Sequence, residues 1–124
     1  MSQMSPENAN IWQIDDDEVG LFIDGNQLKK AGHTIVGASS SRQDATNIIP
    51  HLLEKGVDTV IMDGSLSGQD NTVDGEDLSQ MIIEKHGGEI TIIGHAQSKD
   101  IKNAHFNSPK VKGITNLVKI VTEA

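Results

Sequence analysis

A short run of strand-forming residues that ends in an acid, Thr59 to Met62 followed by Asp63 and Gly64, constrains the fold more than any other stretch. A β-branched and apolar run without polar alternation is typical of a strand that helices cover on both faces of a parallel sheet. Open sheets of this kind bind ligands just outside the carboxyl ends of their strands. Asp63 is therefore either part of a site or the cap of a following helix.

Strand-like and helix-like segments alternate along the chain, which predicts a parallel sheet covered on both faces through right-handed crossovers. Pro50 interrupts the second helix, for which we expect either a kink or a late start near Asn47. The expected strands cover residues 11–14, 33–38, 59–62, 89–94 and 106–111. The expected helices cover residues 19–30, a segment that closes at 55, residues 75–85 and residues 115–124, with one or two further turns at 99–104.

The first of these helices should be weak. Gly20 and Gly25 both lie inside it, and each costs ~1 kcal/mol relative to alanine in a helix interior. Its apolar residues Val19, Phe22 and Ile23 have the i, i+3, i+4 spacing of a buried face. We therefore expect the helix to depend on tertiary contacts of this face, or on a ligand, to be well formed.

Composition limits the possible functions. The 124 residues fit one domain, with residues 1–10 as a flexible polar tail and residues 11–124 as the folded part. The net charge of −8, from 18 acidic and 10 basic residues, argues against a nucleic-acid partner. There is no cysteine, no apolar run long enough to span a bilayer and no signal-peptide pattern, so we expect a cytoplasmic protein without a membrane partner.

Charged residues stand at the ends of several expected strands. Asp15 and Asp16 follow the first strand, Asp63 the third and His95 the fourth, and Lys110 lies near the fifth. The carboxyl ends of parallel strands share one edge, so these side chains should meet there. Helix capping explains one or two acids, but clustered carboxylates repel each other unless a cation offsets them. Oxygen ligands suit Mg²⁺ and a lysine suits phosphate, and an aspartate so placed can attack phosphorus to form an acyl phosphate.

These residues resemble the receiver domains of two-component response regulators over residues 11–124. In that family an acidic pair follows the first strand, as Asp15 and Asp16 do, and the phosphoacceptor aspartate ends the third strand, as Asp63 does. The dipeptide Asp74-Gly75 before an amphipathic helix is also similar. The resemblance implies a flavodoxin-like (CheY-like), doubly wound, five-stranded parallel sheet with helices on both faces.

The resemblance also implies a function and a set of site residues. Mg²⁺ would be held by Asp16, Asp63 and the backbone carbonyl of Ser65, with Asp15 acting through water. The phosphoryl donor would be a histidine kinase or a histidine phosphotransfer protein, and the output would be an unidentified partner of a stand-alone receiver. Such a chain is a phosphoacceptor that catalyses its own phosphotransfer and dephosphorylation, and is not otherwise an enzyme.

Two departures from the family pattern concern the fourth strand and the loop after Asp63. His95 takes the place of the usual Ser or Thr hydroxyl, and its imidazole either donates to a phosphoryl oxygen or has a structural role. The loop after Asp63 is long and lacks the usual proline. The segment from His95 to Lys110 is short, so we expect the fourth helix to be shortened or missing.

Further departures lie near the C-terminus. Lys110 best matches the site lysine of the family, although Val111 stands where a proline is usual, and Lys112 is the alternative. The aromatic switch residue has no clean match, because Asn107 takes its position and Phe106 lies one residue earlier.

Two other functions stay open. A pseudo-receiver would keep the fold and the acids but act as an interaction module that needs no phosphorylation. A phosphohydrolase of the haloacid dehalogenase type is disfavoured, because Ser65 stands where a second aspartate would act as acid and base. The other histidines show no metal-ligand spacing and are expected at the surface; they are His33, His51, His86 and His105.

Overall fold

The computed structural model describes residues 8–67 and 71–124. Its five strands form one parallel sheet in the order β2-β1-β3-β4-β5, which confirms the predicted doubly wound fold. The strands are β1 (Asn10–Ile14), β2 (Thr34–Ser39), β3 (Thr59–Met62), β4 (Thr91–Gly94) and β5 (Phe106–Asn107). The α-helices are α1 (Glu18–Lys30), α2 (Arg42–Ile48), α3 (Val73–His86) and α4 (Ile114–Glu123), and the short 3₁₀ turns are η1 (Ile49–His51), η2 (Gly87–Glu89) and η3 (Lys110–Lys112).

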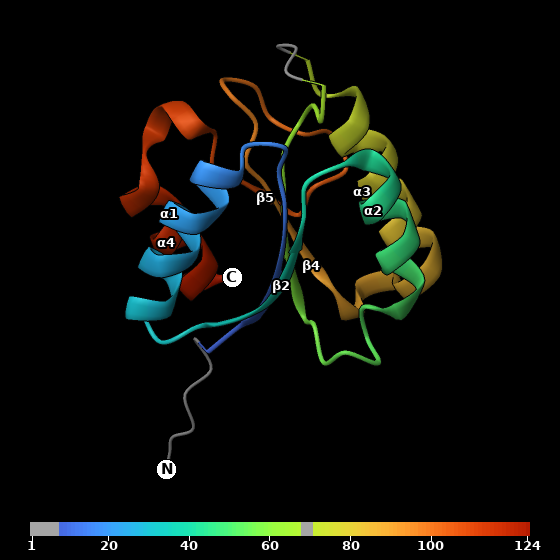
Figure 1. Cartoon of the computed structure of the whole chain (residues 1–124), viewed down its shortest axis with the longest axis horizontal. Coiled ribbons are helices and arrows are strands. Elements are labelled where there is room, and N and C mark those ends of the chain that lie inside the picture. Colours follow the sequence, from blue (N-terminus) through green and yellow to red (C-terminus); the bar gives the residue numbers. More distant parts are fainter. Residues whose placement is uncertain (1–7, 68–70) are drawn as a thin grey trace.

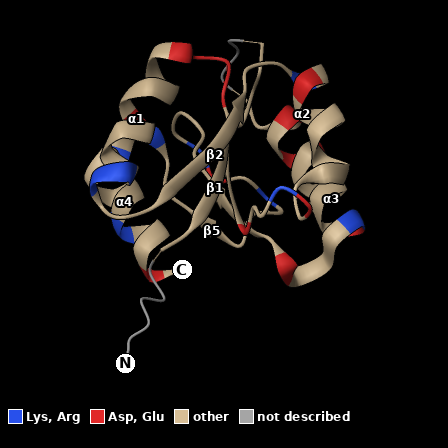
Figure 2. Cartoon of the chain, turned by 60° about the horizontal axis from the view of Figure 1, so that its bottom comes forward, with Lys and Arg blue, Asp and Glu red and all other residues tan. Residues whose placement is uncertain are grey.

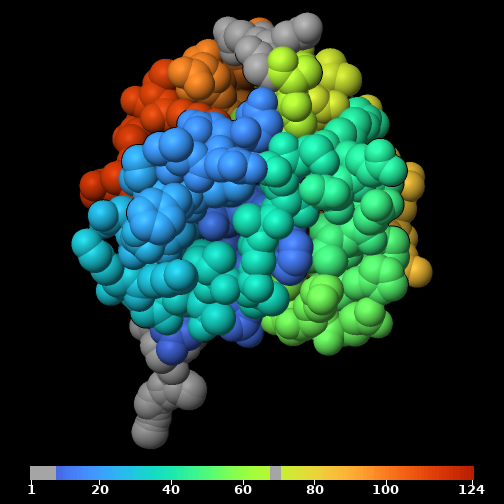
Figure 3. Space-filling view, viewed as in Figure 1, coloured from blue at the N-terminus to red at the C-terminus, as the bar shows by residue number. Residues whose placement is uncertain are grey.

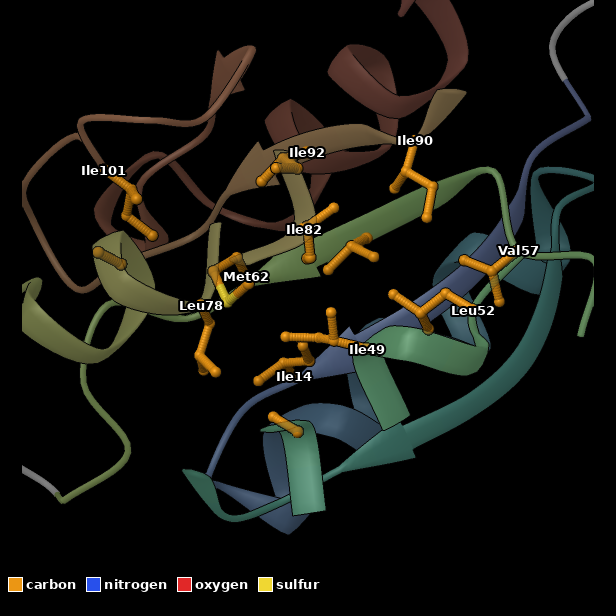
Figure 4. Packing of buried hydrophobic residues seen from close by; sticks show 13 residues of the cluster. Ile14, Ile49, Leu52, Val57, Met62, Leu78, Ile82, Ile90, Ile92 and Ile101 are labelled. Atoms are coloured by element: carbon orange, nitrogen blue, oxygen red, sulfur yellow. The ribbon is translucent and has the colours of Figure 1, made fainter. Parts of the chain in front are cut away.

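The helices cover the sheet in two layers, with α1 and α4 on one face and α2 and α3 on the other (Figure 1). All four residues of β3 are buried, as expected for the central strand. The larger part of the core lies between the sheet and α2 and α3, where aliphatic side chains from both layers interdigitate (Figure 4). A smaller cluster under α1 and α4 consists of Ile11, Leu28, Ile61, Ile93, Leu117 and Val121.

Helix α1 packs on the sheet through a different face from the one predicted. Its buried residues are Gly25 and Leu28. A Cβ at Gly25 would lie 3.1 Å from the side-chain oxygen of Gln13, so the helix approaches the sheet closely at this residue and a larger side chain would require Gln13 to shift. The predicted apolar face points to solvent, with exposed fractions of 68% for Val19, 71% for Phe22 and 50% for Ile23.

Helix α2 starts at Arg42, so the late start near Asn47 was wrong. The hydroxyl of Ser41 caps it by accepting from the backbone N–H of Asp44 at 3.1 Å. The α-helix ends at Ile48, and the chain continues as the 3₁₀ turn η1 around Pro50, which has no N–H for an α-helical bond.

The connection from β4 to β5 contains no helix, which confirms the expected loss of the fourth helix. Instead of the expected helical turns, residues 99–104 contain a hydrogen-bonded turn in which Ala104 N–H donates to the Ile101 carbonyl at 3.2 Å. Strand β5 ends at Asn107, well before the predicted end at 111, and the chain then forms η3 from Lys110. Asn107 holds the connection instead: its side-chain oxygen accepts from the N–H of Ile101 at 2.8 Å, and its amide donates to the carbonyl of Ile101 at 3.3 Å.

Charge is unevenly distributed over the two helical layers. Ribbons of α1 and α4 carry several lysines, whereas acidic residues are frequent on α2 and α3 (Figure 2). The edge strand β2 lies at the surface between α1 and α2 (Figure 3). None of the helices in the described part of the chain is long and apolar enough to cross a membrane.

Candidate functional site

Three carboxylates meet at the carboxyl edge of the sheet. Ile14 pairs with Met62 in the register of β1 and β3, so Asp15 and Asp63 follow on neighbouring strands. One carboxylate oxygen from each of Asp15, Asp16 and Asp63 lies within 4.8 Å of the others. Asp15 and Asp63 are buried, with 5% and 6% of their surface exposed. The predicted acidic cluster is therefore formed by the fold.

Helix capping accounts for another of the acids. Asp17 is the N-cap of α1, and its carboxylate accepts from the N–H of Gly20 at 3.1 Å. Its own N–H donates to Asp15 at 2.9 Å. Asp17 therefore caps the helix, whereas its neighbours Asp15 and Asp16 belong to the acidic cluster.

Lys110 joins the acids from the far end of the chain. Its ammonium lies 2.9 Å from Asp15 Oδ2 and 3.5 Å from Asp63 Oδ1. Burial acts to lower the pKa of Lys110, but the hydrogen bond and charge of Asp15, with those of Asp63, outweigh it and raise this pKa. Lys112, the alternative, is exposed.

Asp63 has the most perturbed acidity among the described residues. Burial raises the pKa of Asp63 to about 7, and the charge of Asp15 adds to the rise. Lys110 and the N–H of Gly64, which donates to Asp63 Oδ1 at 2.8 Å, oppose it. Additional positive charge beside a buried carboxyl with this pKa strongly stabilises its ionised form.

The segment after Asp63 is fixed by bonds to the start of α3. The N–H of Gly75 donates to the carbonyl of Gly64 at 2.7 Å, and Asp74 Oδ2 accepts from the N–H of Leu66 at 2.7 Å. Ser65, the predicted carbonyl ligand, lies between these two anchors and is buried. Its role as a ligand stays a prediction.

The other oxygen of Asp74 extends this anchoring to α2. Arg42 donates to Asp74 at 2.8 Å and to Asp77 at 3.0 Å. Burial acts to raise the pKa of Asp74, but the N–H of Leu66 and the Arg42 guanidinium outweigh it, so this pKa is lowered. This link was not predicted, because Arg42 lies 32 residues from Asp74 and no spacing pattern relates the two.

His95 is buried at the end of β4 and contacts groups other than the acidic cluster. Its Nδ1 lies 2.7 Å from the carbonyl oxygen of Ser108, and its Nε2 lies 3.2 Å from Asp24 Oδ2. Sequence reasoning missed Asp24, which faces the protein from within α1, because no spacing pattern relates it to residues 71 positions away.

Two of the remaining histidines contradict the prediction that they lie at the surface. His33 and His86 are buried, with 4% and 8% exposed. His86 Nε2 lies 2.6 Å from the carbonyl of Ile49 and ties the end of α3 to η1. His51 and His105 are exposed, as expected.

The donor set fits a divalent cation of the Mg²⁺ type. Asp15, Asp16 and Asp63 offer only oxygen, and hard cations prefer oxygen ligands. Asp15 and Asp63 are both buried, and the charge of Asp15 helps to raise the pKa of Asp63, so the pocket has the negative field that such a cation requires. Lys110 is the positive charge that neutralises part of this field in the structure.

Comparisons with known proteins support the fold. No protein-family model and no curated protein matches the sequence. Among solved structures, the chain is similar to the response regulator domain of Thermotoga maritima CheB, with a TM-score of 0.74 and 14% identity over 94% of this chain and 96% of that one. A response regulator receiver domain protein from Clostridium thermocellum has a TM-score of 0.73 and 19% identity, over 93% of this chain and 92% of that one.

A third similar structure is a LuxR-family two-component response regulator from Aurantimonas sp. SI85-9A1, with a TM-score of 0.74 and 19% identity over 94% of this chain and 86% of that one. The chain therefore has the fold of a response regulator receiver domain.

Proposed function

We propose that this chain is a receiver that accepts a phosphoryl group on Asp63, with Mg²⁺, from a histidine kinase or histidine phosphotransfer protein and passes the signal to an output protein. The observation that carries the proposal is the grouping of Asp15, Asp16 and Asp63 within 4.8 Å of one another beside Lys110. This grouping lies at the edge where open parallel sheets bind ligands.

The residues fit the chemistry of phosphoryl transfer. An ionised oxygen of Asp63 attacks phosphorus, and an O–P bond forms as the P–N bond to the donor imidazole breaks and its electron pair returns to nitrogen. Lys110 moves its charge from the carboxylates to a phosphoryl oxygen. Bound Mg²⁺ neutralises charge on the acids and on the phosphoryl group. Because the acceptor is a side chain of the protein itself, the protein is a phosphoacceptor and not otherwise an enzyme.

Intact-mass measurement after incubation with Mg²⁺ and acetyl phosphate tests the proposal. We expect one added phosphoryl group on the wild type and none on Asp63→Asn. Asp58→Asn is the matched control, since Asp58 immediately precedes the same strand at its other end and is exposed. Absence of phosphorylation in the wild type, or equal phosphorylation of Asp63→Asn, would reject Asp63 as the acceptor.

A phosphorylation-independent interaction module is the second candidate. The observation that favours it is the contact of Lys110 with both Asp15 and Asp63, which partly neutralises the pocket without any ligand. Binding of beryllofluoride, a phosphoryl mimic, separates the two: a receiver binds it with Mg²⁺ and loses binding in Asp63→Asn, whereas an interaction module does not bind it.

A further inference from the structure

His95 contacts two acceptors at once. The carbonyl oxygen of Ser108 can only accept, so His95 Nδ1 donates to it at 2.7 Å, while Nε2 lies 3.2 Å from Asp24 Oδ2. The His95 side chain is 6% exposed and that of Asp24 is 18% exposed. These largely buried side chains connect the end of β4 to the middle of α1.

The carbonyl that His95 contacts belongs to the segment that leads to Lys110. Backbone bonds join this segment to the end of β4 and the residues that follow it: Ser108 N–H donates to Gly94 O at 2.8 Å, Lys110 N–H to Ala96 O at 2.7 Å and Val111 N–H to Gln97 O at 3.1 Å. His95 lies between Gly94 and Ala96, and its ring adds a side-chain contact to the Ser108 carbonyl within this same junction.

Position matters for Lys110 because its side chain is long and flexible. Ordering such a side chain costs rotamer entropy, and a fixed backbone at Lys110 helps to keep the ammonium 2.9 Å from Asp15. Asp24, His95, Lys110 and Asp15 line one cavity of about 170 Å³ between α1 and the start of α4. The pair and the lysine are therefore neighbours in space, although they are far apart in the sequence.

We infer that Asp24 and His95 form a positioning pair that holds the Lys110 segment in place for the acidic pocket. The pair acts through Lys110 and does not itself contact the phosphoryl group. This inference rests on the proposed function for its purpose, but the mechanical link that it describes can be measured without phosphorylation.

The test is the rate at which acetic anhydride acetylates each lysine of the folded protein, followed by peptide mass spectrometry. In the wild type, Lys110 should react slowly because its ammonium is paired. His95→Ala and Asp24→Asn should raise the Lys110 rate several-fold and leave the rates of the exposed lysines unchanged. His95→Asn should restore part of the protection, because its amide can still donate toward Ser108.

His86→Ala is the matched control, because His86 is also buried and bonded to a backbone carbonyl but lies at the end of α3. Unchanged acetylation of Lys110 in His95→Ala, or an equal rise in His86→Ala, would overturn the inference. If His95→Ala does not fold, the Lys110 acetylation rate of the near-isosteric variant Asp24→Asn is compared with that of the wild type instead. The labelling requires no phosphodonor, so a wild type that is not phosphorylated would reject the proposed function alone.

Discussion

Lys110 Nζ lies 2.9 Å from Asp15 Oδ2, so a cation near the end of the chain neutralises an acid near its beginning. The second carboxylate of the pocket, Asp63, is 3.5 Å from the same ammonium and keeps a pKa of about 7. One lysine is therefore not enough to balance two buried acids. The first two predictions follow from this imbalance.

Replacement of Asp63 by Asn should stabilise the protein in the absence of metal. The folded-state pKa of Asp63 is raised from 3.8 to about 7, so folding favours its protonated form, and wild-type stability should fall as pH rises from about 4 to 7. The asparagine amide carries no charge, so Asp63→Asn should not lose this folding stability, which is on the order of 2–4 kcal/mol above pH 7. Urea unfolding of both proteins at pH 5 and pH 8 measures it. A stability difference that does not grow with pH would contradict the assigned pKa.

Magnesium should stabilise the wild type. A ligand that binds only the folded state contributes ~2.7 kcal/mol at a concentration a hundred times its Kd. Thermal unfolding in excess Mg²⁺ and in chelator measures the shift in Tm, and Asp16→Asn should reduce it because one oxygen donor is removed. Identical melting curves for the wild type under both conditions would argue against a cation site.

Substitution of Gly75 by Ala should destabilise the fold next to the pocket. Its Cβ would lie 2.5 Å from the carbonyl oxygen of Asp63 and 3.0 Å from Gly64 Cα, and neither backbone can yield without moving the acceptor. We expect a loss of ~1–3 kcal/mol, typical of overpacking. Gly88→Ala is the control, since a Cβ there meets nothing within 4 Å. Trp12, the single tryptophan, reports unfolding of both variants by fluorescence.

Asn107→Ala should loosen the connection between β4 and β5. It removes both side-chain bonds to Ile101, at 2.8 and 3.3 Å, for an expected cost of ~1–3 kcal/mol. Hydrogen exchange at the Ile101 amide should accelerate. Asn103→Ala, in the same connection, loses only one bond of 3.3 Å and should leave that amide protected. Equal exchange in both variants would show that Asn107 does not hold the loop.

The sheet and the acidic cluster were predictable because both depend on local signals. The short β-branched run from Thr59 to Met62 is typical of a buried central strand. Parallel pairing of this strand with β1 then brings Asp15 and Asp63 to one edge of the sheet. The final helix follows the same logic, since Leu117 and Val121 are buried as their spacing predicts.

The packing face of α1 was not predictable, because close approach of a helix to a sheet can override hydrophobic spacing. Gly25 lies against Gln13 at the contact with the sheet, whereas Phe22 has 71% of its surface exposed. The Asp24–His95 contact was equally hidden, since it depends on how α1 is rotated over β4. Polar contacts between distant elements depend on how each helix is rotated about its axis, and the hydrophobic periodicity of the sequence does not determine that rotation.

The crossover from β4 to β5 also sets how easily one edge of the molecule can change shape. Helical crossovers rearrange as cooperative blocks, because their backbone bonds form and break together. Here separate contacts order the connection, among them the two side-chain bonds from Asn107 to Ile101, each worth about 1 kcal/mol, and the burial of Ile101. Such contacts can break one at a time, so this edge can change shape stepwise without melting any helix.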